Sequence, residues 1–412
     1  MSNQPEYRVR AVHCDHRASD EEVYAALKRA TAPLDRSWDK LRRAKTIAIK
    51  FNQDFPPNRL VIWEGQRQQL ISDSVARAVL RLLRENTKAQ LFCADASFHL
   101  IYDGTTLEES THLAPVFREF DVAYINGHTD NVTWHEVPGG GSMFRRYPVS
   151  KRITDCDALI SVQKMKNHTF MGVTLSTKNL FGLMPVKPFG RPRAYYHHLV
   201  RMPYMLADIG RIFNPAMGIL DALVGQAAME WGDGKGTGRI VGGLVAGDHV
   251  VATDACGAYL MGHDPTADWP TPPFHRDRNH LLAASAAAFG TVNLSDIDFV
   301  SELKPQAAGV FYSQEIDPDE MIVSWRRTMC EQALYYREHL SQFEPYAGQY
   351  ILLQDGEVRW HGPIFEQKVS RRLLSGEHPD HAMWLKFVDP DDMEDERYSI
   401  YEQTLKDIAA RV

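Results

Sequence analysis

Short apolar runs alternate with amphipathic stretches along the first part of the chain. Residues 46–51 form an apolar run typical of a strand, and residues 72–85 place their apolar side chains on one helical face. Residues 90–95 form the next apolar run, and this strand–helix–strand order is typical of a parallel βαβ unit. The same patterning predicts further strands at 121–126, 157–163, 217–223 and 240–246, and a helix at 248–261. The predicted fold class is α/β, with mostly parallel sheets and flanking helices.

The character of the sequence changes after about residue 310. Residues 325–342 are polar and helical in pattern, and residues 349–360 read as a β-hairpin with Gly356 in its turn. A helix at 366–374 and a strand at 383–388 are expected to follow. We therefore predict an α/β domain over residues 1–310, which could consist of two lobes with the site between them. Residues 311–412 would form an accessory α+β module that can be removed without harm to the core.

Composition and charge narrow the possible partners. The chain is 44% hydrophobic and 24% charged with a formal net charge of -7, so nucleic acid is not an expected partner. No apolar run is long enough to span a bilayer, and the N-terminus lacks an apolar signal region. We expect a soluble cytoplasmic protein with no membrane partner, and homo-oligomerisation stays open.

Five cysteines stand far apart and form no C-x-x-C pair. This spacing does not match a zinc knuckle or an Fe–S cluster, so no Fe–S cluster is expected. Reduced and mostly buried thiols fit the pattern better.

Positive charge concentrates in the segment 164–239. It contains ten Lys and Arg residues against four Asp and Glu residues, in a chain that is acidic overall. Such a concentration beside strand ends favours a site for a small anionic metabolite, although a solvated basic surface is the alternative.

Lys178 and His168 are the candidate catalytic residues in this segment. The apolar neighbours of Lys178 should desolvate its amine, which lowers a lysine pKa and creates a base or a covalent nucleophile. His168 would be its proton partner. A structural ion pair for Lys178 and a core position for His168 are the alternatives. The residues expected to bind the substrate are Lys164, Lys166, Asn52, Asn179, Arg191 and Arg193.

A second hypothesis is a metal- or cofactor-dependent enzyme. His197 and His198 are adjacent, and with His168 and Asp221 they could supply ligands for a divalent metal. The leading hypothesis is acid–base or covalent chemistry of the racemase, isomerase or lyase type, because no redox motif is visible. A third hypothesis is a protein that binds the anion without turnover.

Several motifs resemble the family labelled domain of unknown function 362, over about residues 40–300. The resemblance rests on Lys-Phe-Asn at 50–52, Lys-Met-Lys-Asn-His at 164–168 and Thr-Lys-Asn-Leu-Phe-Gly at 177–182. Asp221, the glycine-rich loop at 232–238 and Asp254 support it. Many members of that family carry a ferredoxin-type cysteine cluster, which this sequence does not match.

A fainter likeness links the chain to the lactate racemase family, in which a lysine carries a nickel-pincer cofactor. That family has a strand, a histidine and then a lysine at the spacing of His168 and Lys178. The glycine-rich turn between them is not matched, because the corresponding stretch here contains only Gly172. The likeness implies that His168 and Lys178 face a ligand.

Overall fold

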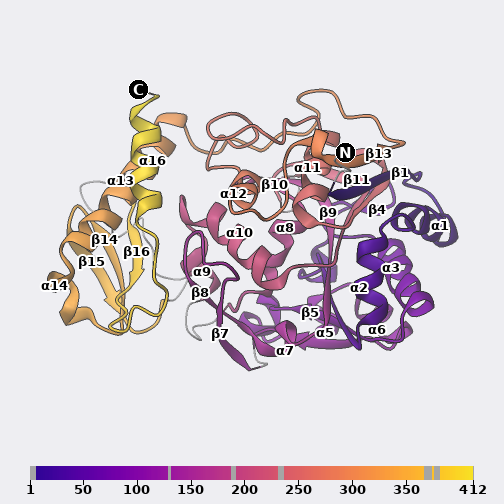
Figure 1. Cartoon of the computed structure of the whole chain (residues 1–412), viewed down its shortest axis with the longest axis horizontal. Coiled ribbons are helices and arrows are strands. Elements are labelled where there is room, and N and C mark those ends of the chain that lie inside the picture. Colours follow the sequence, from indigo (N-terminus) through magenta and orange to yellow (C-terminus); the bar gives the residue numbers. More distant parts are fainter. Residues whose placement is uncertain are drawn as a thin grey trace.

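The computed structural model describes residues 6–128, 131–186, 192–230, 236–365, 374 and 381–411. Two regions are visible in it, a large body built on one sheet and a smaller C-terminal module beside it (Figure 1). None of the helices in these described ranges is long and apolar enough to cross a membrane.

A nine-stranded sheet forms the centre of the large body. Its strands β11, β9, β2, β5 and β6 run parallel to one another, while β12 is antiparallel to both of its neighbours, β1 and β11. This confirms the predicted α/β class with a mostly parallel sheet. The order across the sheet is β13 (Ile297–Ser301), β1 (Tyr7–His13), β12 (Gly236–Gly247), β11 (Met217–Ala228), β9 (Ala158–His168), β2 (Thr46–Phe51), β5 (Gln90–Asp95) and β6 (Ala123–Asn126), with β10 (Gly172–Thr174) paired to β9.

Helices cover both faces of this sheet, because alternate strand residues point to opposite sides. In β2, Ile47 and Ile49 pack into one core and Ala48 packs into another. The first core lies under α1 (Asp20–Thr31), α2 (Asp35–Arg43), α3 (Asp73–Asn86) and α6 (Ala114–Glu119). The opposite face carries α8 (Ser176–Asn179), α10 (Arg201–Phe213), α11 (Val250–Leu260) and α12 (His280–Ala286). Helix α1 begins with a capping box, in which Ser19 and Glu22 bond reciprocally.

Smaller elements connect these layers. Two short antiparallel pairs stand outside the main sheet, and short helices link the strands. These are β3 (Ile62–Trp63) with β4 (Gln66–Arg67), β7 (Val132–Glu136) with β8 (Arg146–Ser150), α4 (Phe98–Tyr102), α5 (Leu107–Ser110), α7 (Lys151–Thr154) and α9 (Arg193–Tyr196).

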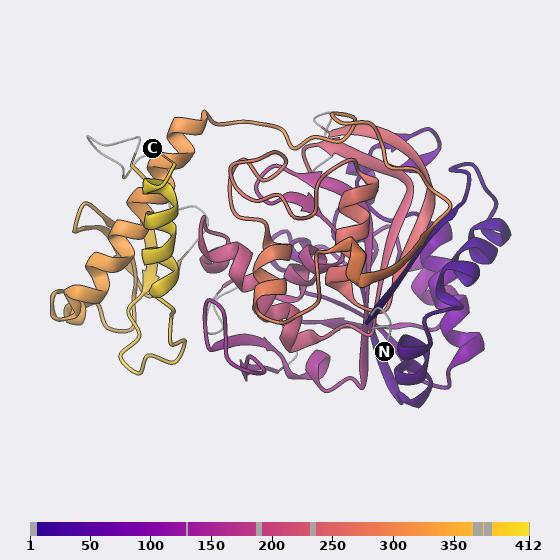
Figure 2. The ribbon, with the colours of Figure 1, turned by 45° about the horizontal axis from the view of Figure 1, so that its top comes forward.

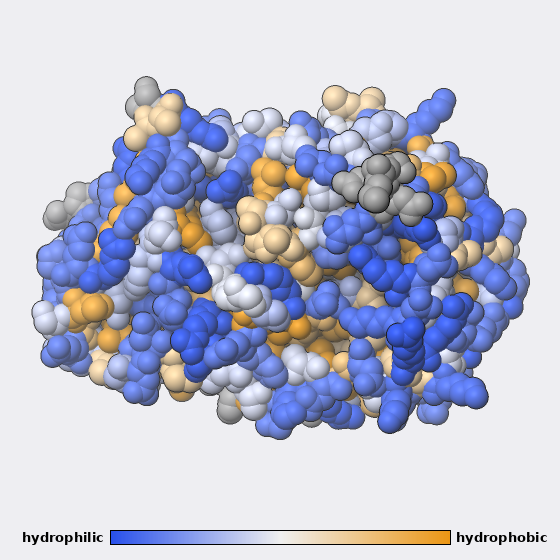
Figure 3. Space-filling view, in the orientation of Figure 1, coloured by the Kyte–Doolittle hydropathy of each residue, from blue (hydrophilic) through white to orange (hydrophobic). Residues whose placement is uncertain are grey.

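The C-terminal module contains a three-stranded antiparallel sheet and flanking helices. The predicted hairpin is β14 (Tyr350–Gln354) with β15 (Glu357–Gly362), and β16 (Trp384–Phe387) pairs with the other edge of β14. Its helices are α13 (Asp319–Glu338), α14 (Leu340–Phe343) and α16 (Ser399–Ala409). The helix predicted at 366–374 lies outside the described residues except for Leu374. On the face shown in Figure 3, hydrophilic residues cover most of both regions.

The module shares a hydrophobic core with the large body. Tyr350, Trp384 and Tyr401 of the module belong to the same buried cluster as Tyr195 and Phe144 of the body. The chain crosses between the two regions before α13, along the orange connection in Figure 2. Residues 311–314 still belong to the body, because Phe311 lies in its core and Ala228 donates its N–H to the Tyr312 carbonyl.

Candidate functional site

A cavity of about 600 Å³ opens at the carboxyl ends of β2, β5 and β9. Ligands of open parallel sheets bind at such strand ends. The lining is rich in charged and polar side chains and carries a few aromatic rings. The residues used below are Lys50, Asn52, Asp95, Gln163, Lys166, His168, Lys178, Asn179, Phe181, Gly182, Arg193, His197 and Glu230.

Helix α8 brings Lys178 to this cavity. The chain turns back after β9 at Gly172, which has a φ of +76° that other residues adopt at a cost, and forms β10 against β9. Asp254 of α11 then accepts the backbone N–H groups of Ser176 and Thr177, at 2.8 and 2.7 Å. Those bonds satisfy the otherwise unpaired N–H groups at the start of α8 and fix its position.

Lys178 is buried in the cavity wall, as its apolar neighbours led us to expect. Lys178 is only 9% exposed to solvent, and its Nζ lies 4.6 Å from the centre of the Phe181 ring. Within the described part of the chain, no carboxylate lies within 4.0 Å of this amine to form an ion pair. Burial lowers the pKa of Lys178 to about 7; Glu230 opposes this shift, while Arg193, Lys166 and Lys50 reinforce it.

His168 ends β9 as a neutral imidazole whose tautomer is set by the backbone. Its Nδ1 accepts the N–H groups of Phe170 and Met171, at 3.0 and 3.3 Å. Since Nδ1 is an acceptor, the ring proton resides on Nε2. Burial holds the pKa of His168 well below its usual range despite the opposing charge of Glu230. His168 is therefore a hydrogen-bond donor at neutral pH, rather than a group that exchanges protons readily.

Glu230 and Lys166 also line the cavity, and hydrogen bonds with the main chain hold both side chains. Thr169 donates its N–H to Glu230 Oε2 at 3.0 Å, and Lys166 Nζ donates to the main-chain carbonyls of Gln69 and Glu230, at 2.9 and 3.0 Å. Burial alone would raise the pKa of Glu230, but the hydrogen bond from the Thr169 N–H and the nearby Lys166 ammonium lower it. Burial lowers the pKa of Lys166 to about 8.

Lys50 and Asp95 form a buried ion pair at the ends of β2 and β5. Their Nζ and Oδ2 atoms are 3.0 Å apart, and burial raises the pKa of Asp95 while Lys50 opposes the shift. Gly182 leaves the room for this pair, because a Cβ there would meet Lys50 Cε at 2.5 Å. The sequence places both residues at strand ends, but we did not predict that they line the site.

Three of the expected binding residues are held by the protein itself. Asn179 donates from Nδ2 to the Lys50 carbonyl at 2.9 Å and to Ser161 Oγ at 3.0 Å, which ties β2 to β9. Arg193 donates to the carbonyls of Ala96, Gly182 and Met184, at 2.6, 3.0 and 3.1 Å. Asn52 accepts a bond from Gln163 Nε2 at 3.1 Å. All three still line the cavity, whereas Arg191 lies outside the described residues.

Lys164 and Asp221 are not brought to the cavity. Both are fully buried, and their Nζ and Oδ2 atoms are 2.8 Å apart. Asp221 also accepts the Ser72 N–H at 2.7 Å. The expected role of Lys164 in holding an anion is corrected accordingly, because its ammonium is already used in a structural ion pair on β9 and β11.

The two adjacent histidines separate in the structure. His197 lines the cavity, with its ring centre 4.7 Å from that of Phe170 and 5.7 Å from that of Phe181. His198 is buried and is not among the lining residues. Over the described ranges, no group of three or more His, Cys, Asp or Glu side chains could hold a metal ion. The ligand set of His168, His197, His198 and Asp221 is therefore not assembled.

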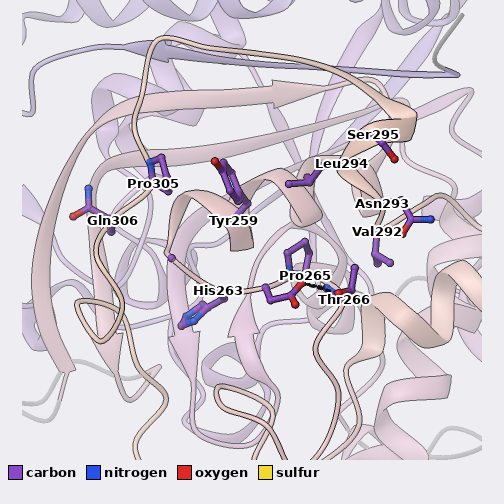
Figure 4. A pocket seen from close by; sticks show the side chains of 12 residues that line it. Tyr259, His263, Pro265, Thr266, Val292, Asn293, Leu294, Ser295, Pro305 and Gln306 are labelled. Atoms are coloured by element: carbon purple, nitrogen blue, oxygen red, sulfur yellow. Dashed lines mark hydrogen bonds between the residues drawn. The ribbon is translucent and has the colours of Figure 1, made fainter.

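A second hollow of about 620 Å³ lies on the outer side of α11 (Figure 4). Tyr259, Pro265 and Leu294 line it together with polar loop residues. His263 is its histidine, and burial lowers the pKa of that ring to about 4. The described lining of this hollow contains no lysine or arginine, so the cavity at the strand ends is the stronger candidate.

Comparison with known proteins places the chain in a family. The model of the domain of unknown function DUF362 matches residues 47–259, which is half of the chain. The chain belongs to this family. Every lining residue named above for the strand-end cavity lies inside the matched DUF362 region.

Two further likenesses accompany the family match. A thylakoid-associated protein from Synechocystis sp. is 30% identical over 253 residues, covering 59% of this chain and 71% of that protein. Among solved structures, the apoprotein of lactate racemase from Thermoanaerobacterium thermosaccharolyticum matches with a TM-score of 0.35 and 14% identity. That match covers 63% of this chain and 58% of the racemase, and a likeness this weak supports no conclusion about activity.

Proposed function

We propose that the chain is an enzyme that binds a small anionic metabolite in the strand-end cavity and moves a proton with Lys178. The observation that carries this proposal is the state of Lys178, a buried amine with a pKa of about 7 and no carboxylate partner among the described residues. A neutral amine at physiological pH can act as a general base. A bound anion would supply the opposite charge that the Lys178 amine does not find within 4.0 Å among the described residues.

The neighbours of Lys178 suggest how the proton transfer would proceed. The Lys178 amine would take a proton from a carbon next to a carbonyl or carboxylate, forming an N–H bond as the C–H bond breaks. The electron pair would pass to the neighbouring oxygen, where the Nε2–H of His168 could donate a hydrogen bond. Lys166 and Arg193 would stabilise the charge of the anion. Return of the proton from Lys178 to the same carbon would give exchange, its return to a neighbouring carbon would give isomerisation, and its return after the intermediate has turned over in the cavity would give racemisation.

Proton exchange tests this proposal before the substrate is known. The protein is incubated in D₂O with a panel of small carboxylates and phosphorylated hydroxy acids, and NMR follows the loss of each C–H signal. We expect exchange with at least one member of the panel, and its loss in Lys178→Met. Binding detected by calorimetry without any exchange would instead favour a non-catalytic anion-binding protein.

A further inference from the structure

The segment 192–201 joins the cavity to the C-terminal module. Its short helix α9 begins with Arg193, which lines the cavity, and His197 follows with its ring against Phe170 and Phe181. Tyr195 and Tyr196 lie between these two residues in the sequence but are fully buried in the core shared with the module. One stretch of chain therefore faces the cavity and the module at the same time.

Two carboxylates of the module hold this segment on either side of His197. The hydroxyls of Tyr195 and Tyr196 donate to the two oxygens of Glu394, at 3.1 and 3.4 Å. Arg201 donates from Nε to Glu396 Oε1 at 3.0 Å. Both carboxylates come from the chain between β16 and α16, and both are buried.

We propose that Glu394 and Glu396 are positioning residues for the cavity, which keep His197 in its wall through the segment 192–201. Neither carboxylate is among the residues that line the cavity, so each acts through the segment it holds. This inference rests on the proposed function, because it assumes that the cavity is the site.

Segment 192–201 needs these two carboxylates because it has little stability of its own. A single helical turn such as α9 cannot persist without tertiary contacts. Without the Glu394 anchor, His197 would move outward and water would enter beside Lys178, while Arg193 would keep its bonds to the carbonyls of Ala96, Gly182 and Met184. Hydration favours the charged amine, so the pKa of Lys178 would rise toward its ordinary value.

Chemical labelling of Lys178 in the full chain tests the inference. The protein is treated with 1-fluoro-2,4-dinitrobenzene, which reacts with the neutral amine, over a series of pH values, and mass spectrometry measures the labelled fraction of Lys178. Wild-type protein should show half-maximal reactivity near pH 7. In Glu394→Gln we expect the pH of half-maximal reactivity, called the half-point below, to rise by about one unit or more. This corresponds to a tenfold loss of reactivity at pH values below 7. Glu402→Gln is the matched control, because it removes an exposed carboxylate that pairs with Arg337 within the module.

A second variant guards against loss of folding in Glu394→Gln. Tyr195→Phe combined with Tyr196→Phe keeps both rings and removes only the two hydroxyls that reach Glu394. The same upward shift is expected in it. A half-point near 7 in the wild type and in every folded variant would overturn the positioning role alone. A wild-type half-point near the ordinary lysine value would overturn the proposed function and this inference together.

Discussion

Two buried clusters of charge lie on opposite sides of the segment 192–201, and they differ in how their charges are neutralised. The clamp cluster comprises Arg201, Lys386, Glu394, Glu396 and Tyr401. In it, Lys386 Nζ lies 2.6 Å from Glu396 Oε2, and Arg201 Nη2 lies 2.9 Å from Glu396 Oε1. In the site cluster, which comprises Lys166, His168, Lys178 and Glu230, the Lys178 amine has no carboxylate within 4.0 Å among the described residues. All residues of the clamp cluster are buried, as are Lys166, His168 and Lys178 of the site cluster, whereas Glu230 is half-buried.

The protonation behaviour of the two clusters follows from this difference. In the clamp cluster, burial works against ionisation, but Arg201 and Lys386 lower the pKa of Glu396 to about 2, and Glu396 raises the pKa of Lys386. In the site cluster, burial prevails and lowers the pKa of Lys178 to about 7. Burial opposes ionisation in both clusters, and only the groups with an opposite charge within ion-pair distance stay charged in spite of it. The clamp cluster is therefore structural, and the Lys178 amine without a carboxylate within 4.0 Å among the described residues supports the proposed anion site.

Removal of the whole module should have the largest effect. A chain ending at Asp317 would expose Tyr195, Phe144 and their neighbours in the shared core, and would leave Arg201 without Glu396. We expect this truncated chain to be insoluble or unfolded, as measured by expression in the soluble fraction and circular dichroism. A soluble and folded truncated chain would restore the separable module expected from the sequence.

Breaking the clamp cluster at one residue should cost about 3–5 kcal/mol of folding free energy. Glu396→Gln leaves the buried Arg201 without its carboxylate and leaves Lys386 with only Glu394, whose Oε2 is 3.9 Å from Nζ. Urea denaturation measures the loss. Glu402→Gln should change the free energy of unfolding by less than about 1 kcal/mol, because the pair it breaks is exposed. Similar losses in the two variants would contradict a structural clamp.

Lys178→Met should have opposite effects on activity and stability. The exchange rate with a carboxylate found in the D₂O panel should fall by about 10²-fold or more, the scale of a lost general base. The free energy of unfolding should stay unchanged or rise, because the variant removes a buried cation that lacks a carboxylate partner in the described chain. Strong destabilisation would show that Lys178 has a structural role like that of Lys386.

The pH dependence of stability separates the two clusters most finely. Between pH 7 and the ordinary lysine pKa of 10.5, the unfolded chain holds a proton on Lys178 that the folded chain has lost. Stability should therefore rise with pH across this window, by at most about 1.4 kcal/mol per pH unit from this group. Glu396 acts in the acidic range instead. Its contribution to stability is present above pH 4.5 and is lost as the pH falls toward 2. Urea titrations at a series of pH values give the free energy of unfolding as a function of pH. Its slope should differ between wild type and Lys178→Met only between pH 7 and 10.5.

Features that depend on neighbouring residues could be predicted from the sequence, whereas ion pairs that depend on strand register could not. The buried apolar runs identified the parallel strands, and the apolar neighbours of Lys178 predicted its burial. The pairing of Lys164 with Asp221 depends on how β9 and β11 align, which no local pattern encodes. The ion pair of Lys50 with Asp95 depends in the same way on the β2–β5 pairing.

The clamp cluster was the least predictable feature. Arg201 and Glu396 are separated by almost half of the chain, and their own neighbours give no sign of their pairing. Arg201 belongs to the basic segment 164–239, but its charge is already neutralised by Glu396. Net charge along a segment therefore overestimates the charge that is available to a ligand.

The most direct test of the central claim is an NMR titration of Lys178 in protein labelled with ¹³C-lysine, with Lys178→Met assigning the signal. We predict a pKa near 7 in the free protein. Saturating inorganic phosphate should raise this pKa, because a bound anion favours the charged amine. A pKa near 10.5 in the free protein, or one that phosphate leaves unchanged while it binds in the cavity, would contradict the account.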